Sequence, residues 1–292
     1  MMAGENSFEI RRAQGFEIYV LRNSFVEISA VPELGAKIIS LKNLRTEREW
    51  LWHPPGDLKL FRNESGDDFS KSPLAGIDDC LPTIESCFWR GRRLPCHGEI
   101  WRAPFRVDAS AWENGILKTR AELKISPFEF ERTMELRGNE IQIGYRLKNQ
   151  SAAEEKFLWA IHPLLKLQTD DRLELPDSTR FLLNGATWVD ALDSAIPEKN
   201  CAKIFAAPVR EGRAAIKNLH TRDRLEFEWD PAENGALGLW LTRGGWHGYH
   251  HFAIEPTNAA DDSLAAAAAQ NRCGKISGNG FASWRICIRV GS

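Results

Sequence analysis

Apolar residues recur along the chain in short runs, and many of these runs alternate with polar residues. Alternation with a period of two is typical of β-strands that bury one face. Turn-forming sequences rich in Gly and Asn separate the runs, for example at residues 113–115, 137–139 and 233–235. The pattern predicts strands at residues 25–29, 37–41, 105–109, 117–125, 128–135, 141–147, 225–229, 237–241 and 281–290. We therefore expect a large antiparallel all-β fold with few short helices.

One segment, residues 261–271, has a helical pattern instead. Five alanines follow Asp261, Asp262 and Ser263, and each of these three is a good N-cap whose side chain can accept a hydrogen bond from a free backbone N–H. The run ends near Gly274. Its small side chains bury little apolar area, so we expect a helix on the surface.

Length and composition allow one large core. The chain has 292 residues, 43% of them hydrophobic, and neither a linker nor an internal repeat divides it. We predict a single domain over residues 1–292, since large all-β folds often exceed the usual domain size. The net charge of −2 comes from 38 basic and 40 acidic residues mixed along the chain. That mixture lacks the positive field that nucleic acid binding needs.

Targeting signals and a disulfide framework are both missing from the sequence. Residues 1–12 carry charged and polar groups where a secretion signal would need an apolar run, and no segment approaches the ~20 apolar residues that cross a bilayer. We therefore expect a cytoplasmic protein. Six cysteines are too sparse for a framework in a chain of this length, so we expect reduced thiols.

Residues 76–105 hold the densest group of polar and aromatic side chains. Their apolar positions follow neither a helical nor a strand period for long, so this stretch is predicted to be mainly loop. Loops held by a rigid scaffold are where binding groups concentrate. The stretch is therefore the first candidate for a binding site.

Two later segments place ionisable groups among apolar ones. Strand alternation puts His162 on a face with apolar neighbours in residues 156–165, and it puts His251 and Glu255 on one face in residues 250–256. A histidine in such a setting is either a hydrogen-bonded core residue or part of a site. A buried carboxylate needs a partner, so Glu255 forms a structural salt bridge or is poised to exchange a proton.

At residues 97–101, which read HGEIW and follow GIDD at 76–79, the chain resembles the aldose 1-epimerase (galactose mutarotase-like) family. The resemblance continues in the family's order with GAKI at 35–38, AIHP at 160–163 and AIEP at 253–256. It covers roughly residues 25–290. The resemblance implies a β-supersandwich whose concave face holds a sugar.

The resemblance also implies an isomerase that interconverts the α and β anomers of a hexose or related sugar without a cofactor. In that reaction a base takes the proton of the anomeric hydroxyl while an acid protonates the ring oxygen; the ring then opens and closes on the other face. By position in the family's motifs, Glu255 matches the base and His162 the acid. His97 matches a histidine that binds the ring side of the sugar.

Further candidates for binding the sugar are less tightly placed. Asp79 is a candidate acceptor for sugar hydroxyls, and Trp101 offers a flat face on which sugar C–H groups stack. Asp190 or Asp193 could supply the acid that the family has between its second histidine and its late glutamate, and the choice between them stays open. Glu99 stands where the better-known branch of the family has glycine.

Arg92 belongs to a basic turn, residues 90–93, four residues before His97. A guanidinium group binds phosphate through two parallel hydrogen bonds. Arg92 is therefore a candidate to bind an anionic substituent of the sugar. The alternative is a solvated hairpin tip whose charges balance nearby acidic residues.

No motif for a cofactor or a metal is present. The sequence contains no G-x-S-x-G, G-x-G-x-x-G or P-loop pattern. Two clusters have spacings that fit no familiar set of metal ligands, namely His247, His250 and His251, and Cys80, Cys87, Cys96 and His97. We therefore predict acid/base chemistry without cofactor or metal.

Two other functions remain open at this stage. One is a non-catalytic carbohydrate-binding or regulatory protein on the same fold, and the other is a carbohydrate-active enzyme of another reaction type. A matched acid and base favour turnover. The expected partner is a small sugar, with no nucleic acid and no membrane, and the oligomeric state stays open.

Overall fold

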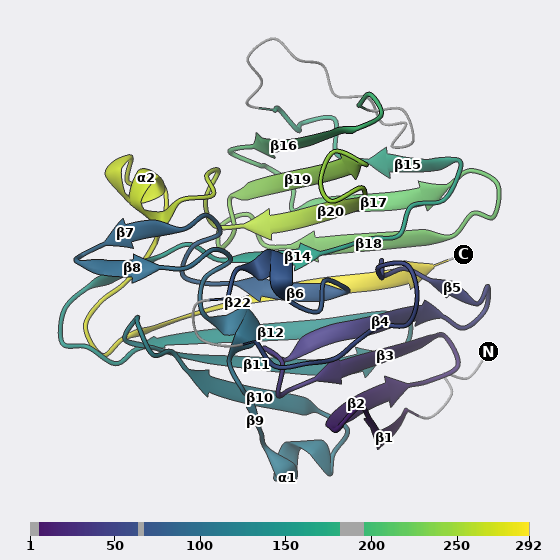
Figure 1. Cartoon of the computed structure of the whole chain (residues 1–292), viewed down its shortest axis with the longest axis horizontal. Helices are drawn as coiled ribbons and strands as arrows, with labels where there is room; N and C mark the ends of the chain where they lie inside the picture. The colour runs from purple at the N-terminus through teal and green to yellow at the C-terminus, as the bar shows by residue number, and fades with distance from the viewer. Residues whose placement is uncertain (1–5, 64–66, 182–195, 292) are drawn as a thin grey trace.

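The computed structural model describes residues 6–63, 67–181 and 196–291, and it consists mainly of two antiparallel sheets. The first sheet has ten strands. In spatial order they are β1 (Ser7–Ala13), β2 (Phe16–Arg22), β3 (Val26–Val31), β4 (Lys37–Asn43), β6 (Ile77–Cys80), β14 (Ala160–Pro163), β20 (His250–Thr257), β19 (Ala236–Arg243) and β16 (Asn200–Ala206), with β5 (Arg48–Glu49) paired to β4. Strands from the two halves of the chain thus lie side by side in its middle (Figure 1).

The second sheet has eight strands. In spatial order they are β15 (Asp171–Glu174), β17 (Arg213–Asn218), β18 (Arg224–Trp229), β22 (Phe281–Gly291), β12 (Glu140–Asn149), β11 (Phe128–Arg137), β10 (Leu117–Glu122) and β9 (Arg106–Val107). Figure 1 shows this sheet overlapping the first in the view down the shortest axis. The pair forms the predicted large β-sandwich.

The two sheets bury their facing sides against each other. Alternate residues of each strand enter this layer, for example Ile161 and Ile254 from the first sheet and Phe130 from the second. Burying a side chain of this size stabilises the fold by about 1.5–3 kcal/mol. The same alternation turns His162 and Glu255 to the other face of the first sheet, away from the second. The strand pattern that builds the core therefore also presents polar groups on the outer face.

Two hairpins and two short helices complete the fold. The hairpins are β7 (Cys87–Trp89) with β8 (Arg92–Leu94), and β13 (Glu155–Phe157) with β21 (Gly274–Ile276). The predicted helix is confirmed as α2 (Leu264–Ala269), whose N-cap Ser263 accepts a hydrogen bond from the backbone N–H of Ala266. It lies beside β7 at one end of the sheets (Figure 1). Within the described ranges, no helix is long and apolar enough to cross a membrane.

The structure differs from the predicted elements in several places. The strand predicted at residues 105–109 pairs only as β9, because Asp108 caps α1 (Ala109–Trp112) by accepting a hydrogen bond from the N–H of Ala111. The predicted list also leaves out several strands of the two sheets, including β1, β2, β15, β16 and β17. Of these, β16 is an edge strand whose residues are mostly exposed or half-buried. An edge strand with one partner shows a weaker hydrophobic alternation than a central one.

Candidate active site

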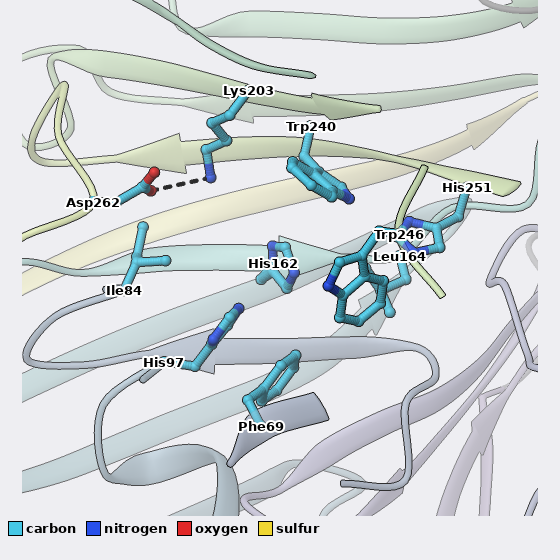
Figure 2. Close-up of a pocket in the computed structure, with 10 residues that line it drawn as sticks. All are labelled: Phe69, Ile84, His97, His162, Leu164, Lys203, Trp240, Trp246, His251 and Asp262. Carbon is cyan, nitrogen blue, oxygen red and sulfur yellow. Dashed lines mark ion pairs between the residues drawn. The ribbon is translucent and has the colours of Figure 1, made fainter. Parts of the chain in front are cut away.

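A pocket lies on the outer face of the first sheet, over β14, β20, β19 and β16. Its volume is about 170 Å³, and since a cavity needs roughly 10–15 Å³ to hold one water molecule, it has room for a small ligand. Figure 2 shows the lining residues, which are Phe69, Ile84, His97, His162, Leu164, Lys203, Trp240, Trp246, His251 and Asp262. Apolar faces combined with a few ionisable groups are typical of sites for small molecules.

His162 and Glu255 meet because β14 pairs with β20. Ala160 lies opposite Thr257, and the same antiparallel register places His162 opposite Glu255. Nδ1 of His162 is 3.1 Å from Oε1 of Glu255. Neither atom has an aligned hydrogen-bond partner in the part of the chain that the structure describes. His162 lines the pocket and Glu255 lies fully buried behind it, so a nitrogen and an acceptor oxygen stand side by side at the pocket wall.

Lys203 covers the other oxygen of Glu255. It projects from β16 across β19, where Gly238 lies opposite Glu255 and leaves room for the long side chain. A Cβ added at Gly238 would lie 3.4 Å from Oε2 of Glu255 and 3.2 Å from the ring of Phe205. The ammonium of Lys203 forms an ion pair with Oε2 of Glu255, and it lies 3.3 Å from Oδ1 of Asp262. One cation therefore bridges two carboxylates.

The charges around Glu255 decide its ionisation. Burial alone would raise the pKa of Glu255, but Lys203 and, after it, His162 lower that pKa to about 2. For Lys203, burial alone would lower the pKa, and the carboxylates of Glu255 and Asp262 outweigh it and raise that pKa. Glu255 is therefore an ionised carboxylate at neutral pH, held by a cation.

His97 lies next to His162 in the pocket lining (Figure 2). The turn that places it needs glycine next, because Gly98 has a φ of +71° and a Cβ there would lie 2.0 Å from the carbonyl oxygen of Leu81. The ring of His97 stacks on Phe69 with centroids 3.7 Å apart, and its centroid is 5.2 Å from that of His162. Burial, followed by the positive charge of neighbouring groups, lowers the pKa of His97 well below its usual value. A neutral ring of this kind both donates and accepts hydrogen bonds.

Glu99 has a structural position outside the pocket. Its Oε2 accepts hydrogen bonds from the backbone N–H groups of Lys124 at 3.0 Å and Ile125 at 2.6 Å, and its Oε1 accepts one from Ser126 at 3.0 Å. These three N–H groups belong to the turn between β10 and β11. Glu99 therefore anchors this turn and does not line the pocket.

We expect Glu99→Gln to lower the free energy of unfolding by about 1–3 kcal/mol, because an amide NH₂ then faces backbone N–H donors that it cannot satisfy. Chemical denaturation of purified protein measures the change. The control is Glu122→Gln on the exposed side of β10, which should stay within about 0.5 kcal/mol of the native protein. Equal stability of the two variants would contradict the anchoring role of Glu99.

The end of the pocket remote from Lys203 is mainly aromatic. Trp246 and Leu164 line it together with His251, while Trp240, which lies opposite Lys203 on β19, stands between the two ends (Figure 2). The ring of His251 lies with its centroid 6.0 Å from that of Trp246. The side chain of His251 is 1% exposed, and neither ring nitrogen has a hydrogen-bond partner among the described residues. A buried polar group without a partner is unusual and calls for an explanation.

The structure brings three of the sequence-predicted site residues together, namely His97, His162 and Glu255. It does not bring Asp79 to them. Asp79 points into the layer between the sheets, where its carboxylate accepts hydrogen bonds from Arg132 at 2.9 Å and Trp159 at 3.2 Å. A carboxylate used in this way is a buried structural ion pair and has no access to a sugar.

Trp101 and Arg92 also lie away from the pocket lining. Trp101 is buried behind Phe69, against which its ring packs edge-on with centroids 5.3 Å apart. Arg92 lies on β8 and pairs with Glu155 of β13 at 2.8 Å, so its fork serves a contact between two hairpins. The remaining candidates, Asp190 and Asp193, lie outside the described residues.

Sequence reasoning did not single out Lys203, Trp240 or Phe69 as site residues, and it considered Asp262 only as a helix cap. Lys203 shares a face of β16 with Phe205, opposite Ile204, and this alternation was too short to recognise. Trp240 alternates with the buried Leu239 and Leu241 of a predicted strand, which was a usable signal for the outer face. Phe69 belongs to a one-turn 3₁₀ segment with no such signal.

Metal ligation has no support in the geometry of the described residues. No group of three or more His, Cys, Asp or Glu side chains there is placed to hold a metal ion. The six cysteines are all free thiols. Cys96 contacts His97 through Sγ and Nδ1 at 3.1 Å, and burial raises the pKa of Cys96 to about 11.

Solved structures resemble the chain over nearly its whole length. A galactose mutarotase-like protein from Clostridium acetobutylicum superposes with a TM-score of 0.73 at 13% identity, with 100% of each chain covered. A protein from Klebsiella pneumoniae, provisionally named aldose 1-epimerase, gives 0.74 at 14% identity, with 98% of this chain and 84% of that chain covered. A galactose mutarotase related enzyme from Lactobacillus acidophilus gives 0.70 at 14%, with 94% and 97% covered.

These likenesses establish the class of fold. The chain has the galactose mutarotase-like β-sandwich fold, and the resemblance seen in the sequence is confirmed at that level. No protein-family model matches the chain. No curated protein matches it either.

Proposed function

We propose that this protein is an aldose 1-epimerase-like isomerase that interconverts the α and β anomers of a hexose or related sugar. The observation that carries the proposal is the 3.1 Å separation between Nδ1 of His162 and Oε1 of Glu255. Anomer exchange moves protons at two oxygens that are bonded to the same carbon. An acid and a base that serve both oxygens must therefore lie within a few ångströms of each other, as these two atoms do.

The mechanism uses both groups in a balanced cycle. Glu255 takes the proton of the anomeric hydroxyl, and the electrons left on that oxygen form the carbonyl as the bond from C1 to the ring oxygen breaks. Protonated His162 gives its proton to the ring oxygen as it leaves. After rotation about C1–C2, the ring oxygen attacks the other face of the carbonyl. His162 then recovers its proton and Glu255 returns its own, so neither group changes over the cycle.

Lys203 controls whether Glu255 can reach the sugar hydroxyl. Its ion pair covers one oxygen of Glu255, and the ammonium contacts Asp262 as well. If Lys203 moves toward Asp262 when a sugar binds, Glu255 gains access to the hydroxyl and becomes a stronger base. We propose that the neutral ring of His97, next to His162 in the pocket lining, hydrogen-bonds the sugar.

A second candidate function is non-catalytic sugar binding, and the same lysine favours it. A carboxylate whose pKa is about 2 is a weak base at neutral pH, and the lysine above it blocks direct contact with the pocket. A protein that only binds sugar would keep the aromatic walls and this locked ion pair. We rank it second because binding alone does not need an imidazole nitrogen placed 3.1 Å from a carboxylate oxygen.

Anomer exchange in purified protein distinguishes the two functions. Freshly dissolved α-glucose and α-galactose are followed by polarimetry and by NMR exchange spectroscopy, with the spontaneous rate as reference. Exchange above that rate supports the isomerase. Sugar binding without faster exchange supports the binding protein, and a new chemical product would point to another carbohydrate reaction.

The remaining parts of the proposal concern the setting. We propose a cytoplasmic enzyme that needs neither cofactor nor metal, whose partner is a small sugar and which contacts neither nucleic acid nor membrane. The names of the similar structures support an isomerase acting on sugars. The mixed surface charge of the chain supports the absence of a nucleic acid partner.

A further inference from the structure

His251 is the buried polar group that the proposed mechanism does not use. It lines the pocket, its side chain is 1% exposed, and both ring nitrogens lack a hydrogen-bond partner within the described ranges. Leaving such a group unsatisfied destabilises the free protein. We therefore look for a hydrogen-bond partner of His251 in another state of the protein. A ligand bound in the pocket would be such a partner.

The position of His251 relative to Glu255 fixes which part of a sugar it could meet. The two residues are four positions apart on β20 and share its outer face. At about 3.3 Å per residue their Cα atoms are roughly 13 Å apart. With side chains reaching inward from both ends, a sugar whose anomeric carbon lies at Glu255 and His162 turns its far side toward His251. That side carries the substituents at C4 and C6.

The charge at this end of the pocket is zero. Burial, and after it the charges of His162 and His250, lowers the pKa of His251 to about 3, so its ring is neutral at physiological pH. The ring of His251 lies near two tryptophan rings. Its centroid is 4.8 Å from that of Trp52 and 6.0 Å from that of Trp246. A neutral imidazole donates one hydrogen bond and accepts another, which suits a hydroxyl group.

Cations are confined to the opposite end. In the described part of the chain, Lys203 is the one lysine or arginine that lines the pocket. Figure 2 shows it beside Asp262, with His162 and Trp240 between it and His251. The ammonium is already paired with two carboxylates. A phosphate or carboxylate at the His251 end would lose its hydration and gain no cation, which is strongly unfavourable.

We infer that the His251 end of the pocket is a subsite for a neutral sugar, in which His251 hydrogen-bonds a hydroxyl at C4 or C6 and the sugar's C–H face packs against Trp240 and Trp246. The inference rests on the proposed function in taking a sugar as the ligand. It adds the class of substrate, which is an unphosphorylated sugar. Flat aromatic rings beside one polar group suit a ring that is apolar on its faces and polar at its edges.

Methyl glycosides test the subsite without depending on turnover, because they cannot open their rings. Binding of methyl α- and β-glycosides of glucose, galactose and mannose is measured by calorimetry or saturation-transfer NMR. For the glycoside that binds best, the 4-deoxy, 6-deoxy and 6-phosphate forms are measured next. We expect the phosphate form to bind at least tenfold more weakly than its neutral parent.

The decisive variant is His251→Phe, which keeps the aromatic ring and removes the nitrogens. We expect it to bind the parent glycoside roughly tenfold more weakly while binding one of the two deoxy forms as well as the native protein does. The ligand-free variant should melt at the same temperature as the native protein or higher, because an unpaired polar group has been removed. His250→Phe, at the exposed first position of β20 and pointing away from the face of His251, is the matched control and should change neither property.

Each outcome of these binding experiments supports or overturns the neutral-sugar subsite. A 6-phosphate that binds as tightly as its parent would overturn the neutral subsite. So would a His251→Phe variant that leaves parent binding unchanged, or that weakens the parent and both deoxy forms alike. Failure of every neutral glycoside to bind would also reject it. Binding of glycosides with the expected pattern, but no exchange of free sugars, would support the subsite and reject only the isomerase.

Discussion

Replacing Glu255 with glutamine is expected to lower the rate of anomer exchange by about 10²–10⁴-fold, the usual effect of losing a general base. The amide keeps the shape of the side chain but cannot take the proton of the anomeric hydroxyl. Affinity for the sugar should stay within about tenfold, because Glu255 lies behind the pocket wall and His97 and His251 remain. NMR exchange rates and calorimetry on the same preparation separate the two effects.

A control for this substitution must be an equally buried glutamate away from the pocket. Glu226 of β18 is 4% exposed and pairs with Arg224 and Arg289 on the second sheet. Glu226→Gln should keep the native exchange rate even if it is less stable. A Glu255→Gln protein that is folded and exchanges anomers at the native rate would remove Glu255 from the mechanism.

Much of the fold could be predicted from the sequence because its core is periodic. Alternation in segments such as residues 128–135 and 141–147 marks strands that bury one face, and β11 and β12 extend them by only a few residues. Several strands were not predicted, among them β2, β17 and the edge strand β16, which is half-exposed and has no strong period. The arrangement of two large sheets came from the family resemblance, because strand order depends on contacts between distant segments.

The site was predictable only where a short motif marked it. His97, His162 and Glu255 each belong to such a motif, and the register of β14 with β20 brings the last two into contact. Asp79 was misplaced because neighbouring residues of a strand point to opposite faces, and the sequence alone did not say which face of β6 was the core. Lys203 lies on β16, which was not predicted, so its ion pair with Glu255 could not be predicted either.

That ion pair makes Lys203 the residue that sets the acidity of the site. In the native protein Lys203, and after it His162, lower the pKa of Glu255 to about 2, so Glu255 stays ionised through the weakly acidic range. The groups that face Glu255 are His162 from β14, Asp262 from the loop before α2, and the buried thiol of Cys80 from β6. Without Lys203 the burial of Glu255 and the nearby carboxylate of Asp262 both favour the protonated acid.

Lys203→Met is therefore expected to move the acid limb of the rate profile upward in pH. A raised pKa means that Glu255 of the variant is protonated over a pH range in which Glu255 of the native protein is ionised. A protonated Glu255 cannot act as a base. The ratio of kcat/KM at pH 8 to that at pH 5 should rise at least about tenfold in the variant relative to the native protein.

The charge-preserving variant Lys203→Arg tests whether loss of the positive charge causes the shift of the acid limb. Arginine keeps a cation between Glu255 and Asp262, so its profile should stay close to the native one while Met shifts it. At high pH the Met variant, with Glu255 uncovered and ionised, should retain exchange activity, because Lys203 itself takes no proton in the cycle. Superimposable profiles for native protein and Lys203→Met would show that the lysine does not tune the base. Loss of exchange at every pH in a folded Met variant that still binds sugar would instead give the ammonium a direct part in the reaction.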